Sequence, residues 1–174
     1  IIDPLKHSLI ANEITSVMGI VNGTTNYMLT RMADNGLSYE DALHEAQQKG
    51  FAEADPTADV GGFDAAAKIA ILASIAFNSR VTLDDVFTDG ITNISPVDIE
   101  AARDMGYVIK LLAIAHRRED GVDVRVHPTM IPTNHQLATV NGVFNAIYVT
   151  GDAVGETMFF GEGAGAGPAA RCGS

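Results

Sequence analysis

One stretch of the chain gathers acidic side chains just before a lone lysine. Residues 50–64 carry four carboxylates, Glu53, Asp55, Asp59 and Asp64. In the apolar segment 65–77 that follows, Lys68 is the one charged residue. Asp64 and Lys68 are spaced i and i+4, so on a helix they share one face and can form an ion pair. An amine held in this way can exchange a proton with a substrate hydroxyl group. We therefore expect Lys68 and Asp64 to be catalytic.

The helix that carries Lys68 is apolar on every side, with Ile69, Ile71, Leu72 and Ile75 next to it. Helices of this kind are normally buried, where an unpaired ammonium is costly. The pattern therefore predicts that Lys68 is shielded from water and compensated by a carboxylate or a substrate. The alternative is an ordinary solvated ion pair at the start of a helix.

Three motifs together resemble those of the homoserine dehydrogenase family. Segment 50–56 reads Gly-Phe-Ala-Glu-Ala-Asp-Pro and is followed by Asp59, Asp64 and Lys68 at the family's spacing. Segment 19–27 (GIVNGTTNY) and segment 161–167 (GEGAGAG) supply the second and third matches. With Pro4-Leu5-Lys6 and His127-Pro128, the resemblance covers nearly the whole chain.

The resemblance implies an oxidoreductase that interconverts L-homoserine and L-aspartate 4-semialdehyde with NAD or NADP, in the biosynthesis of threonine, methionine and isoleucine. In this family the lysine at position 68 is the proton donor for carbonyl reduction. Asp64 would orient that lysine or the substrate hydroxyl. A homodimer formed by pairing of sheets is also implied.

Further acidic and glycine-turn residues are expected to bind the substrate. Glu53 suits the substrate ammonium, because a carboxylate makes a charge-assisted hydrogen bond; a plain surface acid is the alternative. Asp59 is either a second substrate contact or a turn acid that bonds to backbone near Gly61. Phe51 would contribute its backbone more than its ring.

The Asn22-Gly23-Thr24 sequence lies where a strand meets a helix. Its free backbone N–H groups and the Thr24 hydroxyl indicate an anion site that could take the substrate carboxylate. An ordinary N-cap is an equally favoured interpretation.

The glycine-rich run near the end does not fit a dinucleotide fingerprint, which needs a complete strand, turn, helix and second strand. The resemblance implies instead that Gly163 and Gly165 touch a cofactor bound mainly by a separate N-terminal nucleotide-binding domain. That domain, which would determine the choice between NAD and NADP, is expected to precede residue 1. We expect residues 1–167 to form the catalytic and dimerisation domain, and residues 168–174 to be a tail that departs from the family.

Composition excludes several classes of partner. With 22 acidic and 11 basic residues the net charge is −11, which opposes binding to nucleic acid or to anionic membranes. The single cysteine, Cys172, fits a reducing cytoplasmic setting. Zinc-type Cys and His spacings are absent from the sequence, so no metal is expected, and the five histidines are interpreted as structural or surface residues.

Periodicity and turn signals predict helices early in the chain and strands late. Strands are expected over 14–21, 107–117, 122–131, 146–149 and 156–161, and helices over 24–33, 38–48, 64–78 and 96–105. This order indicates an α+β domain, a mixed β-sheet with helices packed on one face. Besides the dehydrogenase, two functions stay open. They are a dimerisation and small-ligand module without activity of its own and, less favoured, another amino-acid or semialdehyde enzyme.

Overall fold

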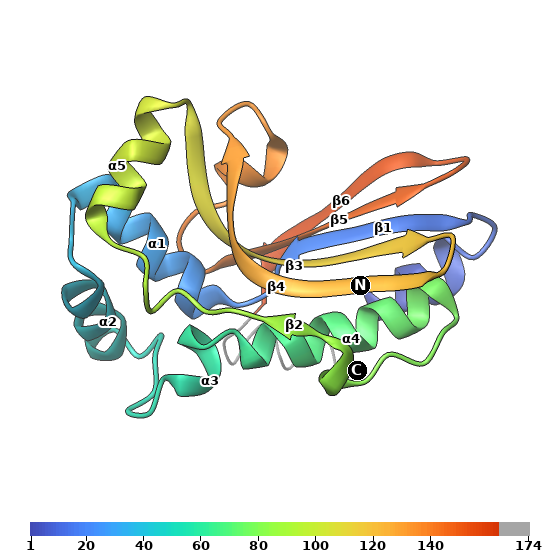
Figure 1. Cartoon of the computed structure of the whole chain (residues 1–174), viewed down its shortest axis with the longest axis horizontal. Helices are drawn as coiled ribbons and strands as arrows, with labels where there is room; N and C mark the ends of the chain where they lie inside the picture. The colour runs from blue at the N-terminus through green and yellow to red at the C-terminus, as the bar shows by residue number, and fades with distance from the viewer. Residues whose placement is uncertain (164–174) are drawn as a thin grey trace.

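The computed structural model describes residues 1–163, and a six-stranded mixed sheet runs through its centre (Figure 1). The strands in chain order are β1 (Ile14–Ile20), β2 (Phe87–Thr88), β3 (Tyr107–Arg118), β4 (Gly121–Pro132), β5 (Phe144–Gly151) and β6 (Gly155–Glu162). Their order across the sheet is β2-β4-β3-β1-β5-β6. The short β2 runs parallel to β4, and all other neighbours are antiparallel.

Five helices and three short turns complete the described chain. The helices are α1 (Gly23–Asn35), α2 (Tyr39–Gln48), α3 (Thr57–Val60), α4 (Phe63–Phe77) and α5 (Pro96–Asp104). The turns are η1 (Pro4–Ser8), η2 (Leu83–Asp85) and η3 (Gln136–Thr139). Ser38 and Ser95 cap α2 and α5 by accepting hydrogen bonds from the backbone N–H groups of Asp41 and Asp98.

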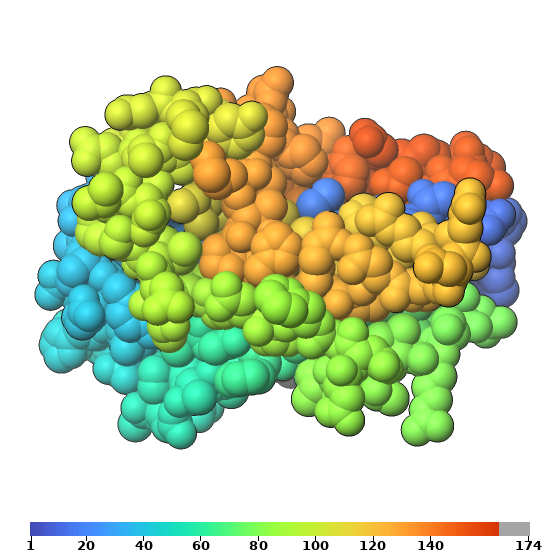
Figure 2. Space-filling view, viewed as in Figure 1, coloured from blue at the N-terminus to red at the C-terminus, as the bar shows by residue number. Residues whose placement is uncertain are grey.

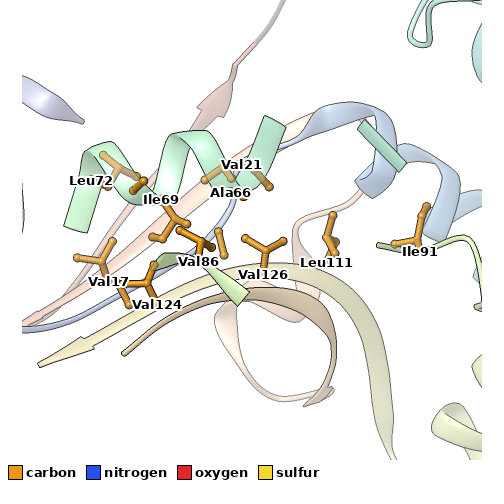
Figure 3. Close-up of a cluster of buried hydrophobic side chains, with 14 of the residues drawn as sticks. Val17, Val21, Ala66, Ile69, Leu72, Val86, Ile91, Leu111, Val124 and Val126 are labelled. Atoms are coloured by element: carbon orange, nitrogen blue, oxygen red, sulfur yellow. The ribbon is translucent and has the colours of Figure 1, made fainter. Parts of the chain in front are cut away.

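The main core lies between α4 and one face of the sheet. Figure 3 shows Ile69 of α4 directed toward Val17 of β1 and Val124 of β4, and Leu72 belongs to the same buried cluster. Ile69 and Val17 are fully buried, and burial of side chains of this size stabilises by about 1.5–3 kcal/mol each. This packing fixes the start of α4, and with it Asp64 and Lys68, relative to the end of β1.

The opposite face of the sheet carries a second, smaller apolar cluster. Leu112 and Tyr148 pack there against Leu137 and Val140 from the η3 region, which lies on the side of the sheet away from α4 (Figure 1). Cover on this face is incomplete, because Phe160 of β6 is 58% exposed.

The predicted α+β class and the mixed sheet with helices on one face are confirmed, and every predicted helix and strand is present with ends within two residues or so of those expected. Three short elements, η1, α3 and η3, were not predicted, and each has five residues or fewer. Figure 2 shows the segment that contains β2 lying against β4 at the edge of the sheet. No helix within residues 1–163 is both long and apolar enough to span a membrane.

Candidate active site

The predicted pair of Asp64 and Lys68 forms at the start of α4. The Lys68 ammonium donates to Asp64 Oδ2 at 2.6 Å and to the carbonyl oxygen of Val21, just after β1, at 2.9 Å. An ammonium has three N–H donors, so one remains for a ligand as far as the described residues show. The lysine is therefore held at a fixed position between two segments far apart in the sequence.

The prediction that Lys68 is shielded from water is wrong. Its side chain is 47% exposed, and Ile71, one turn away, is 53% exposed. The apolar sequence of α4 is explained differently: one face packs on the sheet, while Lys68 and Ile71 project from the other. The pair is a partly solvated one, whose electrostatic contribution to stability is small.

Asn22 connects the two carboxylates of the site, a role that the sequence analysis missed. This side chain is buried, and its Nδ2 donates to Asp59 Oδ1 at 2.7 Å and to Asp64 Oδ2 at 2.9 Å. Its Oδ1 caps α1 by accepting from the N–H of Thr25 at 2.9 Å. In the sequence, an asparagine before a helix indicates only a cap. The contacts to residues 37 and 42 positions away appear only in the fold.

The first turn of α1 offers an anion site made of backbone. The N–H groups of Gly23 and Thr24 have no acceptor among the described residues. The Thr24 hydroxyl, in contrast, donates to the carbonyl oxygen of Phe51 at 2.6 Å, so its proton is already used. A Cβ atom at position 23 would lie 2.9 Å from the carbonyl oxygen of Val143, which makes glycine the residue that fits.

Two pockets meet at Lys68. The polar pocket has a volume of about 390 Å³ and is lined by Asn22, Gly23, Thr24, Lys49, Gly50, Phe51, Asp59, Asp64, Lys68, Val143, Asn145 and Gly163. The apolar pocket has a volume of about 230 Å³ and is lined by Ile1, Ile2, Val21, Lys68, Ile71, Leu72, Asn145, Ile147 and Gly163. Lys68, Asn145 and Gly163 border both pockets.

Gly163 lies directly against Asn145 at this border. A Cβ atom added to Gly163 would lie 1.8 Å from Asn145 Nδ2, so no larger residue fits without movement. Asn145 Oδ1 is buried and accepts no hydrogen bond from the described residues. The second glycine expected at a cofactor, Gly165, lies outside the described residues, as does the tail 168–174.

Glu53 is separate from the other predicted site residues. It is exposed and does not line the polar pocket; its backbone carbonyl accepts from the Gln47 side chain at 3.0 Å. Phe51, Asp59, Asp64, Lys68, Gly23 and Thr24 are brought together, whereas Glu53 lies outside the group.

The rim of the polar pocket is held by a charged network beneath Phe51. The Phe51 and Tyr27 rings lie 4.9 Å apart, and the Tyr27 hydroxyl donates to Glu45 at 2.8 Å. Lys49, which also lines the pocket, contacts Glu45 at 2.7 Å. Hydrogen bonds from Lys49, then Tyr27 and Arg31, lower the pKa of Glu45 to about 2. This carboxylate therefore stays ionised and holds the rim in place.

Comparison with known proteins identifies the family of this chain. The family model described as homoserine dehydrogenase matches residues 1–172. The homoserine dehydrogenase of Corynebacterium glutamicum is 55% identical over 98% of this chain and 39% of the relative, and that of Synechocystis is 55% identical over 98% and 40%.

Solved structures give the same result. A homoserine dehydrogenase from Thiobacillus denitrificans superposes with a TM-score of 0.95 and 47% identity, over 97% of this chain and 39% of that one. A hyperthermophilic archaeal homoserine dehydrogenase mutant in complex with NADPH has a TM-score of 0.79 and 27% identity, over 95% and 46%. The chain thus spans about two fifths of the length of its curated relatives. On its sequence and its fold, the chain belongs to the homoserine dehydrogenase family.

Proposed function

We propose that this chain forms the substrate-binding and catalytic region of an NAD(P)-dependent homoserine dehydrogenase, which interconverts L-homoserine and L-aspartate 4-semialdehyde. The observation that carries the proposal is the position of Lys68. Its ammonium is fixed by Asp64 and the Val21 carbonyl at the border of a polar and an apolar pocket. The carbon of the reacting group exchanges hydride with the cofactor while its oxygen exchanges a proton, so a proton-transfer group is needed at such a border.

The polar pocket has groups for each end of the amino acid. The free N–H groups of Gly23 and Thr24, at the positive end of α1, suit the carboxylate. Asp59 suits the ammonium from within the pocket. Glu53 would join it after a change in side-chain position. This arrangement directs the reacting carbon toward Lys68.

Lys68 supplies the proton chemistry of the reaction. In the direction of reduction, the third N–H of its ammonium gives a proton to the aldehyde oxygen as the carbon gains hydride. In the direction of oxidation, the neutral amine takes the proton from the hydroxyl group. Because the side chain is 47% exposed, water can restore either form between turnovers. Asp64 fixes the direction of the ammonium through their hydrogen bond.

The apolar pocket fits a nicotinamide ring. Its walls include Ile71, Leu72 and Ile147, and the Asn145 side chain lies at its border with the polar pocket. When bound, NADP or NAD supplies or accepts the hydride. Gly163, and Gly165 after it, would allow the cofactor a close approach. The archaeal relative was solved with NADPH, which supports a nicotinamide dinucleotide as the cofactor. The choice between NAD and NADP stays open for this chain.

A second copy of the chain fits the incompletely covered face of the sheet, so we include a homodimer in the proposal. Phe144 and Phe160 stack there at 5.1 Å between ring centres, and Phe160 is 58% exposed. The substitution Phe160→Asp would place a charge in the contact. We expect it to convert a dimer to a monomer in light scattering, and a parent chain that is already monomeric would contradict the dimer.

The decisive experiment is a chimera, in which this chain replaces the matching segment of the Corynebacterium glutamicum relative. We expect NADP- or NAD-dependent oxidation of L-homoserine, and a loss of about 100-fold to 10,000-fold in kcat for Lys68→Met. Lys6→Met, a change of the same type at an exposed lysine, serves as the control. A folded chimera without activity, or an active Lys68→Met variant, would contradict the proposal.

The alternative, a dimerisation and small-ligand module without its own activity, is tested on this chain alone by calorimetry. Titration with L-homoserine, repeated with Glu53→Ala and Lys68→Ala, shows whether the pocket is complete. Binding that is lost in the variants supports a complete substrate site. Absence of binding to the parent, with dimerisation retained, favours the module.

A further inference from the structure

A second lysine, Lys110 of β3, is buried and has no acidic partner. It is 3% exposed, and no carboxylate within residues 1–163 forms an ion pair with it. Two other charged residues, Arg103 and Asp34, line the same small pocket as Lys110. An isolated buried charge is costly, so its retention calls for a compensating interaction.

The compensation comes from three uncharged acceptors. The Lys110 ammonium donates to Val140 O at 2.7 Å, to Asn141 Oδ1 at 2.9 Å and to Asn26 Oδ1 at 3.1 Å. These use all three of its N–H groups. Burial lowers the pKa of Lys110 to about 8, which leaves the ammonium as the main form at neutral pH.

Asn26 of α1 binds the same part of the chain, residues 140–144. Asn26 Nδ2 lies within hydrogen-bonding distance of three carbonyl oxygens, those of Val140 at 3.1 Å, Gly142 at 3.0 Å and Phe144 at 3.1 Å. Lys110 and Asn26 thus bind segment 140–144 jointly. The Lys110 ammonium also donates to the side-chain oxygen of Asn26, Oδ1.

The bound segment leads directly into the proposed site. Val143, within it, and Asn145, the next residue after it, line the polar pocket, and Asn145 also lines the apolar pocket. The carbonyl oxygen of Val143 lies so near Gly23 that a Cβ atom there would be 2.9 Å away. A displacement of segment 140–144 would therefore move both the wall beside the α1 anion site and the border of the two pockets.

We infer that Lys110 is a positioning residue of the active site, which acts through segment 140–144 to place Asn145 between the substrate and the cofactor. The inference rests on the proposed function. A lysine suits this position because three acceptors converge on one point, and an ammonium is the side-chain group that offers three donors from a single atom. An apolar residue of similar length would fill the space and leave those acceptors unpaired.

The test is a double-mutant cycle in the chimera described above, with Lys110→Met and Asn145→Ala. Each single change is expected to lower kcat/KM about tenfold, and the double variant to be no worse than about the stronger single one, since both remove the same placement. Losses that multiply to about 100-fold, or an unchanged kcat/KM in Lys110→Met, would overturn the inference. A purely structural lysine would give the multiplied loss.

A second measurement separates this inference from the proposed function. In this chain alone, Lys110→Met is expected to shift the NMR signals of the Asn145 side-chain amide, while Arg103→Met is expected to leave them in place. Arg103 is the matched control because it removes a neighbouring cation that donates to the Ala33 carbonyl of α1 and not to segment 140–144. Unshifted Asn145 signals in a folded Lys110→Met variant would contradict the inference even if the chimera is inactive. Lys110→Gln is the second variant, to be measured in the same way if Lys110→Met does not fold.

Discussion

The two lysines at either end of the site region are held in opposite ways. Lys68 is half-exposed and paired with a carboxylate, whereas Lys110 is buried and surrounded by uncharged acceptors. Lys68 keeps one donor free at the meeting point of two pockets, whereas all donors of Lys110 are used inside the protein. If Lys68 is the proton donor, as we propose, burial does not by itself identify a lysine that reacts. The free N–H donor and the pockets in front of it identify Lys68 instead.

The largest effect is expected from a change to the acids around Lys68. Asn22→Asp would remove both N–H donors and place a third carboxylate beside Asp59 and Asp64. We expect the free energy of unfolding to fall by roughly 3–5 kcal/mol, measured by urea denaturation, because a buried polar network is left with like charges. Asn35→Asp, at the exposed end of the same helix, is the matched control. Equal stability of the two variants would mean that Asn22 is only a helix cap.

The second prediction concerns the pH dependence of stability that comes from Lys110. Burial lowers its pKa from 10.5 to about 8 in the folded chain. Between these values the unfolded chain binds more protons than the folded one, so the free energy of unfolding rises with pH in this window. The difference between the parent and Lys110→Met should therefore rise by about 3 kcal/mol between pH 8 and pH 10.5.

Urea denaturation at several pH values measures this difference, and taking the difference cancels the tyrosines that titrate in both proteins. Arg103→Met should show no such rise, since its guanidinium stays charged throughout. A flat difference for Lys110→Met would place the ammonium in a more solvated position than the hydrogen bonds indicate.

A smaller effect is expected at the border of the two pockets. Gly163→Ala would place a methyl group 1.8 Å from the present position of Asn145 Nδ2, which has to move. Because this atom is the end of a flexible side chain, the fold should persist while kcat/KM of the chimera falls about tenfold. Gly161→Ala is the control, because its Cβ would meet no atom within 4 Å. Equal kinetics of the two variants would remove Asn145 from the site.

The smallest effect concerns the rim. The pKa of Glu45 is lowered from 4.5 to about 2, first by the hydrogen bond from Lys49. The stabilisation is complete above about pH 4.5 and is lost as the pH falls through about 2. Glu45→Gln should lower the stability at neutral pH, flatten the profile between about pH 4.5 and 2, and approach the parent at the acid end. Thermal unfolding at several pH values between about 2 and 7 measures this profile. A Glu45→Gln profile with the parent's slope would contradict the assignment of this pH dependence to Glu45.

The features that depend only on residues close together in the sequence could be predicted from it. The i, i+4 pair of Asp64 and Lys68, the Ser38 cap and the ends of most elements follow from the sequence. The exposure of Lys68 did not, because an all-apolar helix leaves open which of its faces meets the sheet. The role of Asn22 depends on contacts made only when α1 and α4 come together. Lys110 gave one signal that could have been used, a lone charge within the otherwise uncharged stretch 107–115.

Asn22 also limits how this protein can evolve. Its short amide uses the oxygen to begin α1 and the nitrogen to join Asp59 and Asp64. Aspartate lacks the donors, serine and threonine offer a single O–H, and glutamine adds a methylene group that displaces both ends. One side chain thus serves folding and chemistry together, and selection on either keeps it in place. A lineage that changes its substrate would therefore be expected to vary the surrounding acids before it varies position 22.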